Sequence, residues 1–311
     1  MEDPTKYVID KLCSVKSYEE YQSLQMKPEE SNDLFGRLVK ENEPFCAGKM
    51  GFVEIMSLNR QLTALSKGEQ TDYTGVAQML FFNAGVFPAS VANYDKFNEV
   101  YLSHIPDLDF FGMWVFGPEP PGVTEKEVYE KWATSARGRG LVCAGCWDPF
   151  HHEKPWTGAL RGKKVLVVSP FADTMHKQYA KRDKIWDNPD ILPQFDELRT
   201  IKCPLSAGFQ QSPYDDWHEG LDKLKKAMNE IDFDVCFVGA GAWGLPLAVH
   251  AKRLGKVGIH SGGDLQLMFG IKGKRWDANP SRSCFYNEHW VRPSEEETPR
   301  AKELVENGCY W

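Results

Sequence analysis

The sequence lacks any long hydrophobic run, and no apolar stretch among its 311 residues is long enough to span a membrane. It also lacks a surplus of basic residues. The formal net charge of −7 disfavours a general nucleic-acid partner or an anionic membrane surface. The first residues, MEDPTKYVIDKL, contain no signal-peptide core, and internal repeats are absent. We therefore expect an ordinary globular protein with no membrane span and no nucleic-acid partner.

Cysteine pairs of the kind that hold zinc are also scarce. Cys143 and Cys146 have C-x-x-C spacing, with His151 and His152 close behind, but a second well-spaced pair is missing. We therefore expect buried thiols and polar loop residues here, and no metal site. The 8 cysteines are scattered, and several lie in strand-like runs, which is typical of reduced thiols in a cytoplasmic compartment.

The most informative stretch runs from residue 232 to residue 276. Residues 235–238 are apolar and partly β-branched, which predicts a strand buried on both faces. The helical periodicity of residues 245–254 ends at Gly255, a favourable residue after a helix, and residues 257–260 predict a second strand. A glycine turn follows each strand: Gly239, Gly241 and Gly244 with G-x-G-x-x-G spacing, then Ser261, Gly262 and Gly263.

These two glycine turns predict a phosphate site. In an open α/β sheet, ligands bind at the carboxyl ends of the strands, where backbone N–H groups of the turn and of the next helix can hold a phosphate. The alternative is that the glycines only permit close packing of strand and helix. We favour a phosphate-bearing ligand because the strand and helix context is right and a second turn lies beside the first.

Strand and helix patterns alternate through the rest of the chain. Strands are predicted at 45–47, 108–116, from 141, and at 165–168 and 195–203, and helices at 7–16, 31–40, from 52, and at 91–103, 125–135, 174–182 and 215–231. The alternation predicts an α/β fold: a Rossmann-like, mostly parallel, doubly wound sheet with flanking helices. We divide the chain into an N-terminal helical segment (1–43), a Rossmann-like catalytic domain (44–276, with 44–150 and 160–276 as candidate halves) and an irregular C-terminal tail (277–311).

The first glycine turn also has the pattern of an NAD fingerprint, but its context disfavours NAD. The turn is near the end of the chain, with too little sequence after it for a two-half domain. The second strand ends in His260 and Ser261 instead of the acid that would bind the ribose. A mononucleotide diphosphate fits better. Lys272, Lys274 and Arg275 could surround the diphosphate and offset the charge that develops on it as it departs; the alternative is that they form a solvated basic loop.

Glu54 is the first candidate for a catalytic carboxylate. It lies in the first turn of a predicted helix, after a glycine-containing loop, where the helix dipole favours a negative charge. It is either a capping group or a working base that faces a cleft. Asp72 and Asp173 are second choices. Ser169 ends the clearest strand of the sequence, and we expect it to meet the ligand.

The run from Gly239 to Trp276, GAGAWGLPLAVHAKRLGKVGIHSGGDLQLMFGIKGKRW, resembles the C-terminal signature of a group of bacterial and large-virus proteins found with glycan-building enzymes. The likeness extends to KKVLVVSPF at 163–171 and PFCAGKMGFVE at 44–54. This group is similar to glycosyltransferases of the GT-D type, and the nearest analogy is to chlorovirus enzymes that build capsid-protein glycans. The resemblance implies a single Rossmann-like domain and a cytoplasmic location in a bacterium or a virus-infected host cell.

The resemblance also implies a function. It predicts a glycosyltransferase that moves a sugar from a nucleoside-diphosphate sugar, with UDP favoured, to a hydroxyl of an oligosaccharide or glycoprotein glycan, with inversion and a carboxylate base. A G-D-G-E-like motif falls on residues 51–54, with Phe52 at the metal-associated Asp, which disfavours a Mn or Mg cofactor. The predicted site comprises Glu54, Asp72 and Asp173 for catalysis, and Gly51, Ser169, Gly239, Gly241, Ala242, Trp243, Gly244, His260, Gly262, Gly263, Gln266, Lys274, Arg275 and Trp276 for the sugar nucleotide.

Two other classes of function stay open. A non-catalytic sugar-nucleotide-binding module would bind the donor without hydrolysing or transferring it. The second alternative is another transferase of polysaccharide assembly, such as a pyruvyl transferase or a GT-B enzyme with residues 1–150 as its second half.

Overall fold

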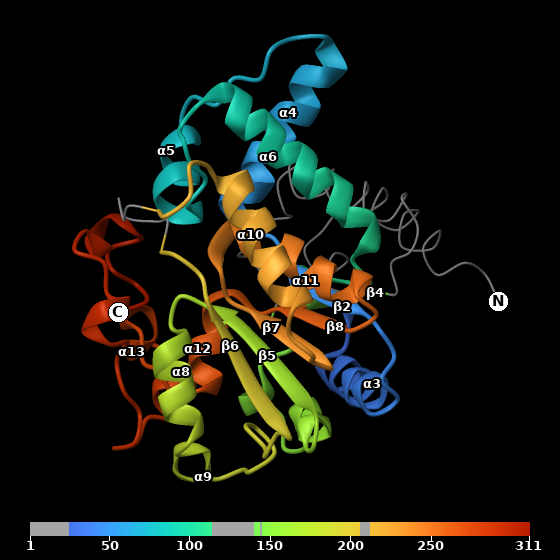
Figure 1. Ribbon diagram of the computed structural model, residues 1–311, viewed down its shortest axis with the longest axis vertical. Helices are drawn as coiled ribbons and strands as arrows, with labels where there is room; N and C mark the ends of the chain where they lie inside the picture. Colours follow the sequence, from blue (N-terminus) through green and yellow to red (C-terminus); the bar gives the residue numbers. More distant parts are fainter. Residues whose placement is uncertain (1–24, 114–139, 144, 206–211) are drawn as a thin grey trace, which may run out of the picture.

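The computed structural model describes residues 25–113, 140–143, 145–205 and 212–311. Within them one sheet runs through the molecule, and helices cover both of its faces (Figure 1). The helices predicted at 7–16 and 125–135 lie outside these ranges. No helix in the described ranges has both the length and the apolar character needed to cross a bilayer.

All neighbouring strands of the sheet are parallel. The strands are β1 (Gln25–Met26), β2 (Cys46–Lys49), β3 (Phe110–Met113), β4 (Gly140–Cys143), β5 (Lys164–Ser169), β6 (Glu197–Lys202), β7 (Val235–Val238) and β8 (Val257–His260). Their order is β1-β4-β3-β2-β8-β7-β5-β6. The predicted α/β, Rossmann-like, parallel sheet is therefore confirmed.

Each face of the sheet has its own hydrophobic core. One core lies under α4 (Phe52–Lys67), α6 (Val91–His104), α10 (Trp217–Asn229) and α11 (Gly244–Arg253). The other lies under α3 (Pro28–Lys40), the 3-10 helix Trp156–Leu160, α8 (Ala172–Tyr179) and α12 (Leu265–Met268). Successive residues of β5 enter opposite cores, Leu166 the first and Val167 the second, as the two-residue period of a strand requires. Shorter helices are α5 (Ala77–Met79), the π-helix Leu80–Ala84, α9 (Arg182–Ile185), α13 (Lys274–Asp277) and α14 (Pro280–Ser283).

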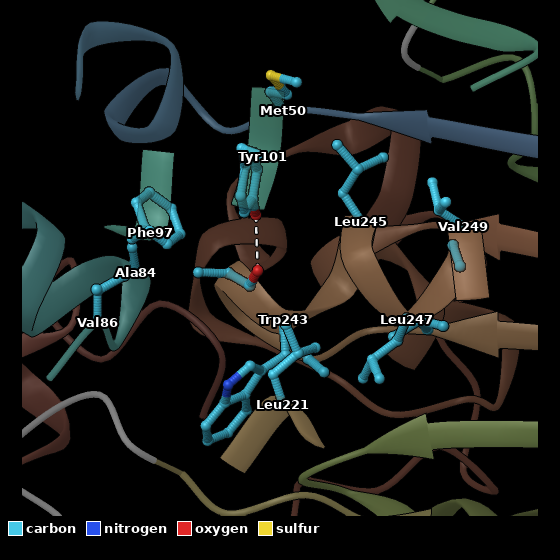
Figure 2. Packing of buried hydrophobic residues seen from close by; sticks show 14 of the residues in the cluster. Met50, Ala84, Val86, Phe97, Tyr101, Leu221, Trp243, Leu245, Leu247 and Val249 are labelled. Atoms are coloured by element: carbon cyan, nitrogen blue, oxygen red, sulfur yellow. Dashed lines mark hydrogen bonds between the residues drawn. The ribbon is translucent and has the colours of Figure 1, made fainter. Parts of the chain in front are cut away.

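The turn between β7 and α11 is fixed in the first core. Trp243 packs in this core together with side chains of α6, α10 and α11 (Figure 2). The hydroxyl of Tyr101 donates a hydrogen bond of 2.7 Å to the carbonyl oxygen of Ala242, and the indole N–H of Trp243 donates one of 2.9 Å to the carbonyl oxygen of Trp217. Both buried polar groups are thereby satisfied, so the start of α11 is held rigidly.

The direction of the connections explains where a cleft can form. The chain leaves β2 and β7 toward the first face, with α4 and α11, but it leaves β5 and β8 toward the second face, with α8 and α12. The strands β5, β7, β8 and β2 are neighbours in that order. Neighbouring strands therefore lead into helices on opposite faces, and the chain segments that follow them separate at the carboxyl edge of the sheet. Such points are where open α/β sheets bind ligands.

Two segments differ from the simple pattern of the sequence. The segment 1–43, predicted to be helical, also contributes β1, which pairs with β4. A strand of two residues is too short to show an alternation of polar and apolar residues. The tail 277–311 contains short helical turns and one isolated β-bridge, from Val291 to Ile271, and it buries Trp290, Glu297 and Trp311 against the rest of the protein.

Candidate functional site

A cavity of about 670 Å³ opens at the carboxyl edge of the sheet, where β2, β5, β7 and β8 end. A cavity of this size holds a small molecule. The predicted residues in its wall are Gly51, Glu54, Ser169, Gly239, Gly241, His260, Gly262, Gly263, Gln266 and Arg275. They come from four separate strand ends and from the chain after β8, so the fold brings together most of the candidates.

Seven other candidates do not line this cavity: Ala242, Trp243, Gly244, Trp276, Lys274, Asp72 and Asp173. The first four are buried in packing positions. Lys274 is exposed and donates a hydrogen bond of 2.8 Å to the carbonyl oxygen of Asn307. Asp72 is exposed and accepts one of 2.8 Å from the backbone N–H of Thr74. Asp173 is exposed and forms an ion pair of 2.5 Å with Lys202.

Glu54 lies in the cavity wall at the start of α4. Gly51 is the N-cap of this helix, and a Cβ atom at Gly51 would lie only 2.1 Å from Oε2 of Glu54, so the carboxylate folds back over the glycine. Glu54 is 8% exposed. Burial raises the pKa of its carboxyl to about 7; its own backbone N–H works in the opposite direction, and the charge of Glu306 adds to the rise. A carboxyl with this pKa can take up or release a proton near neutral pH.

The two glycine turns lie against each other at the cavity. A Cβ atom at Gly239 would lie 2.7 Å from the carbonyl oxygen of Gly262. The backbone of Gly262 has a φ of 63°. Close packing also explains Gly244, because a Cβ atom there would lie 2.0 Å from the ring of His260. Burial, with the charge of Lys49, lowers the pKa of His260 to about 4, so this imidazole is neutral at pH 7. The packing alternative therefore accounts for Gly239 and Gly244, while Gly262 has a backbone conformation that favours glycine.

Lys49, which is buried, and Asp264, which is partly exposed, form an ion pair in the cavity wall. Lys49 is the last residue of β2, and its Nζ lies 2.8 Å from Oδ2 of Asp264. Nearby, Arg282 of the tail lies 3.1 Å from Oδ2 of Asp148. Burial and the charge of Asp264 hold the pKa of Asp148 well above its usual range. Burial acts in the same direction on Asp264, but Lys49, Arg282 and Arg275 outweigh it, and the pKa of Asp264 is lowered.

The tail lies beside α12 and α13 (Figure 1). Several of its residues line one side of the cavity. The guanidinium of Arg275 lies 4.7 Å from the ring centroid of Tyr310 and forms an ion pair with Glu306. Tyr310 packs directly on Gly263, where a Cβ atom would lie 2.5 Å from the tyrosine ring. The amide of Gln266 donates a hydrogen bond of 3.1 Å to the carbonyl oxygen of Tyr310, which holds the tail against the second glycine turn.

The start of α8 is already occupied by a carboxylate of the protein. Glu297 accepts hydrogen bonds from the backbone N–H groups of Asp173, at 2.9 Å, and Thr174, at 3.2 Å. The hydroxyl of Ser169 accepts one of 3.1 Å from the backbone N–H of Phe171. Because these donors are satisfied within the chain, the start of α8 does not offer them to a phosphate.

The wall carries little that would hold a metal ion. In the described part of the chain, no group of three or more His, Cys, Asp or Glu side chains is placed to bind one. At the motif position of the metal-associated Asp, the wall presents Phe52, which is 56% exposed. A phenyl ring supplies no ligand atom, so the residues at this position do not fit a divalent metal ion.

All five charged residues of the wall other than Glu54 and Arg275 were missed by the predictions from sequence, as was one tyrosine: Lys49, Asp148, Asp264, Arg282, Glu306 and Tyr310. A signal existed for Lys49, because it is a cation at the end of a buried strand, on the edge where ligands bind. The tail residues carry no such local signal.

Comparisons of the chain with protein-family models, with curated proteins and with solved structures gave no match. The fold is an α/β fold with one parallel, Rossmann-like sheet. Such folds support many activities, so a function has to be argued from the chemistry of the cavity.

Proposed function

We propose that the protein is a glycosyltransferase that moves a sugar from a nucleoside-diphosphate sugar, with UDP favoured, to a hydroxyl of an oligosaccharide or glycoprotein glycan. The observation that carries this proposal is a convergence in one cavity: two glycine turns, cationic side chains and a buried carboxylate with a raised pKa share its wall. Each part meets one requirement of sugar transfer.

The donor's diphosphate is assigned to the turns after β7 and β8. Gly241 and Gly262 both have positive φ values, 53° and 63°, and both line the cavity. Backbone N–H groups at such turns can bind phosphate oxygens. Arg275 lies in the same wall and can offset the charge that grows on the diphosphate as it departs.

Glu54 is assigned the role of base. The acceptor hydroxyl gives its proton to the Glu54 carboxylate while its oxygen attacks the anomeric carbon of the sugar. The bond from that carbon to the phosphate oxygen breaks, and the nucleoside diphosphate leaves with the electron pair. A single carboxylate on the acceptor side is enough for a transfer that inverts the anomeric configuration. The position of Glu54 in the cavity wall and its pKa of about 7 support this role.

The sequence resemblance supports the same class. The motif that resembles the GT-D type covers the turns at 239–244 and 261–263 and the cavity residues Gln266 and Arg275. Its short N-terminal counterpart ends at Glu54. The two parts are far apart in the chain and meet in one cavity because β2 pairs with β8.

The test is a pair of matched substitutions, Glu54→Gln in the cavity and Glu69→Gln at an exposed position after α4. Thermal shift against UDP, GDP, CMP, NAD and phosphoenolpyruvate identifies the ligand, because a ligand of the native state raises the melting temperature. We expect UDP to bind both variants, and UDP-sugar transfer to be lost only in Glu54→Gln. Binding of UDP with no turnover of any UDP-sugar would indicate a non-catalytic module, and binding of NAD alone would overturn the proposal.

A further inference from the structure

We propose that Lys49 is the cation that binds a phosphate of the ligand at the Gly262–Gly263 turn, in the place that a divalent metal ion would otherwise take. The identity of the ligand as a sugar nucleotide rests on the proposed function. The phosphate site itself rests on the geometry around Lys49.

Lys49 lies under the second glycine turn. It is 5% exposed and lines the cavity. A Cβ atom at Gly262 would lie 3.3 Å from Cε of Lys49, so the turn and the lysine stem are in contact. The ring of Trp147 flanks the ammonium group, with 5.8 Å between Nζ and the ring centroid. The side chain of Lys49 therefore lies beside the second glycine turn, in the wall of the cavity.

The charges around Lys49 leave a positive excess. Lys49 and Arg282 are two cations, and Asp264 is one anion because its pKa is lowered. Burial and the charge of Asp264 hold the pKa of Asp148, the partner of Arg282, well above its usual range, which favours the neutral form of this carboxyl. With Asp148 in that form the cluster carries more positive than negative charge, and a largely buried positive cluster attracts an anion more strongly than an exposed cation does, because water screens it less.

In the basic run at 272–275, Arg275 lines the cavity, but the two lysines are less suited than Lys49 to bind a phosphate there. Lys274 does not line the cavity; it is exposed and lies near Asn307 and Glu303 of the tail. The ammonium group of Lys272 lies over the ring of Tyr286, 5.3 Å from its centroid. Of the lysines in the described residues, Lys49 alone lines the cavity.

The place of Lys49 also bears on the metal question. Asp264 is the carboxylate nearest to the second glycine turn in sequence, and a metal ion that linked it to a phosphate would need the space next to Oδ2 where Nζ lies, 2.8 Å away. The lysine therefore takes the role of the ion: it neutralises Asp264, and in the proposal its ammonium group also binds the phosphate. Phosphate binding is then independent of divalent metal.

The experiment measures binding of UDP and of inorganic pyrophosphate by isothermal titration calorimetry, in EDTA and again with Mn²⁺. The variants are Lys49→Met, Lys49→Arg and the matched control Lys274→Met. We expect wild-type protein to bind both probes in EDTA. Lys49→Met should weaken binding roughly ten- to hundredfold, the usual effect of losing a hydrogen bond to a charged group. Lys49→Arg should retain part of the affinity, and Lys274→Met should be close to wild type.

The outcomes separate this inference from the proposed function. Binding of UDP that is equal in wild type and in Lys49→Met, or wild-type binding that EDTA abolishes, would overturn the inference and leave the glycosyltransferase proposal standing. Binding of pyrophosphate but not of UDP, lost in Lys49→Met, would support the inference and count against the glycosyltransferase. Binding of neither probe to wild type would overturn both.

A second variant covers the case in which Lys49→Met does not fold. Asp264→Asn removes the anion that competes for the ammonium group and keeps the side-chain volume. We expect it to bind pyrophosphate more tightly than wild type in EDTA. Unchanged or weaker binding would show that Lys49 serves only to neutralise Asp264.

Discussion

The carboxylate of Glu297 caps the first turn of α8 at Thr174, although 123 residues separate the two in the chain. Oε1 accepts the backbone N–H of Thr174 at 3.2 Å, and Oε2 accepts the threonine hydroxyl. Glu297 is fully buried. A residue of the irregular tail thus supplies the negative charge that the positive end of a helix favours, and it fastens the tail beside the cavity.

We predict that Glu297→Ala lowers the free energy of unfolding by about 3 kcal/mol, because it leaves buried donors of α8 without an acceptor. Urea denaturation followed by circular dichroism measures the change. Glu297→Gln should have an intermediate effect, and Glu295→Ala, at an exposed neighbouring position, should change stability by less than about 0.5 kcal/mol. Equal stability of the two alanine variants would contradict the capping role.

The transfer rate should rise with pH through about 7. In the proposed mechanism Glu54 acts as a carboxylate, and its pKa is about 7, so the active form is lost as the pH falls below that value. The measurement is kcat/KM against pH between 5 and 9 with a UDP-sugar. Glu54→Gln should show a rate lower by roughly 10²–10⁴ and no inflection near pH 7. If the inflection of kcat/KM near pH 7 persists in Glu54→Gln, a group other than Glu54 causes it, and the role of Glu54 as base is contradicted.

Glu54 should also make the stability of the protein depend on pH. Its pKa is raised in the folded state, from 4.5 to about 7, so the native protein binds this proton more tightly than the unfolded chain. Its stabilising contribution is complete below pH 4.5 and is lost as the pH rises through 7. We therefore expect Glu54→Gln to be more stable than wild type at pH 8, by at most about 3 kcal/mol, and similar at pH 4. Parallel urea titrations at the two pH values measure the difference in unfolding free energy between Glu54→Gln and wild type. A stability gain of the variant that is larger at pH 4 than at pH 8 would contradict the prediction.

Gly244→Ala should destabilise the protein by roughly 1–3 kcal/mol, because the new methyl group would meet the buried ring of His260 at 2.0 Å. Gly36→Ala is the matched control within a helix. There the nearest atom is 3.6 Å away, and the better helix propensity of alanine should leave stability unchanged or raise it by up to about 1 kcal/mol. Chemical denaturation of both variants measures the two changes in unfolding free energy. A tolerated alanine at 244 would show that the helix can move away from β8.

The local part of the fold could be predicted from the sequence. Val165 to Val168 form an apolar run in the predicted strand position, and β5 extends it by one residue at each end. The helix after β2 and its first-turn Glu54 also follow from local pattern, because a glycine loop precedes an apolar periodicity. β1 was missed because two residues show no period.

The polar wall of the cavity could not be predicted in the same way. Lys49 and Asp264 are 215 residues apart, and they meet only because β2 lies next to β8 in the sheet. Arg282 and Asp148 are 134 residues apart and meet through the position of the tail. Strand order and the position of an irregular segment are set by packing of the whole chain, so short-range patterns do not report them.

The strand order has a consequence for how the protein is made. β8 is the last strand of the sheet in sequence, yet it lies between β2 and β7, and Ile259 aligns with Ala47 on one side and with Phe237 on the other. During synthesis, β2–β4 and β5–β7 cannot join until residue 260 has left the ribosome. Until then the nascent chain exposes unpaired strand edges at β2 and β7, which other chains can bind. A pause in translation before this point would therefore prolong an aggregation-prone intermediate, and the yield of folded protein should depend on chaperones that act late.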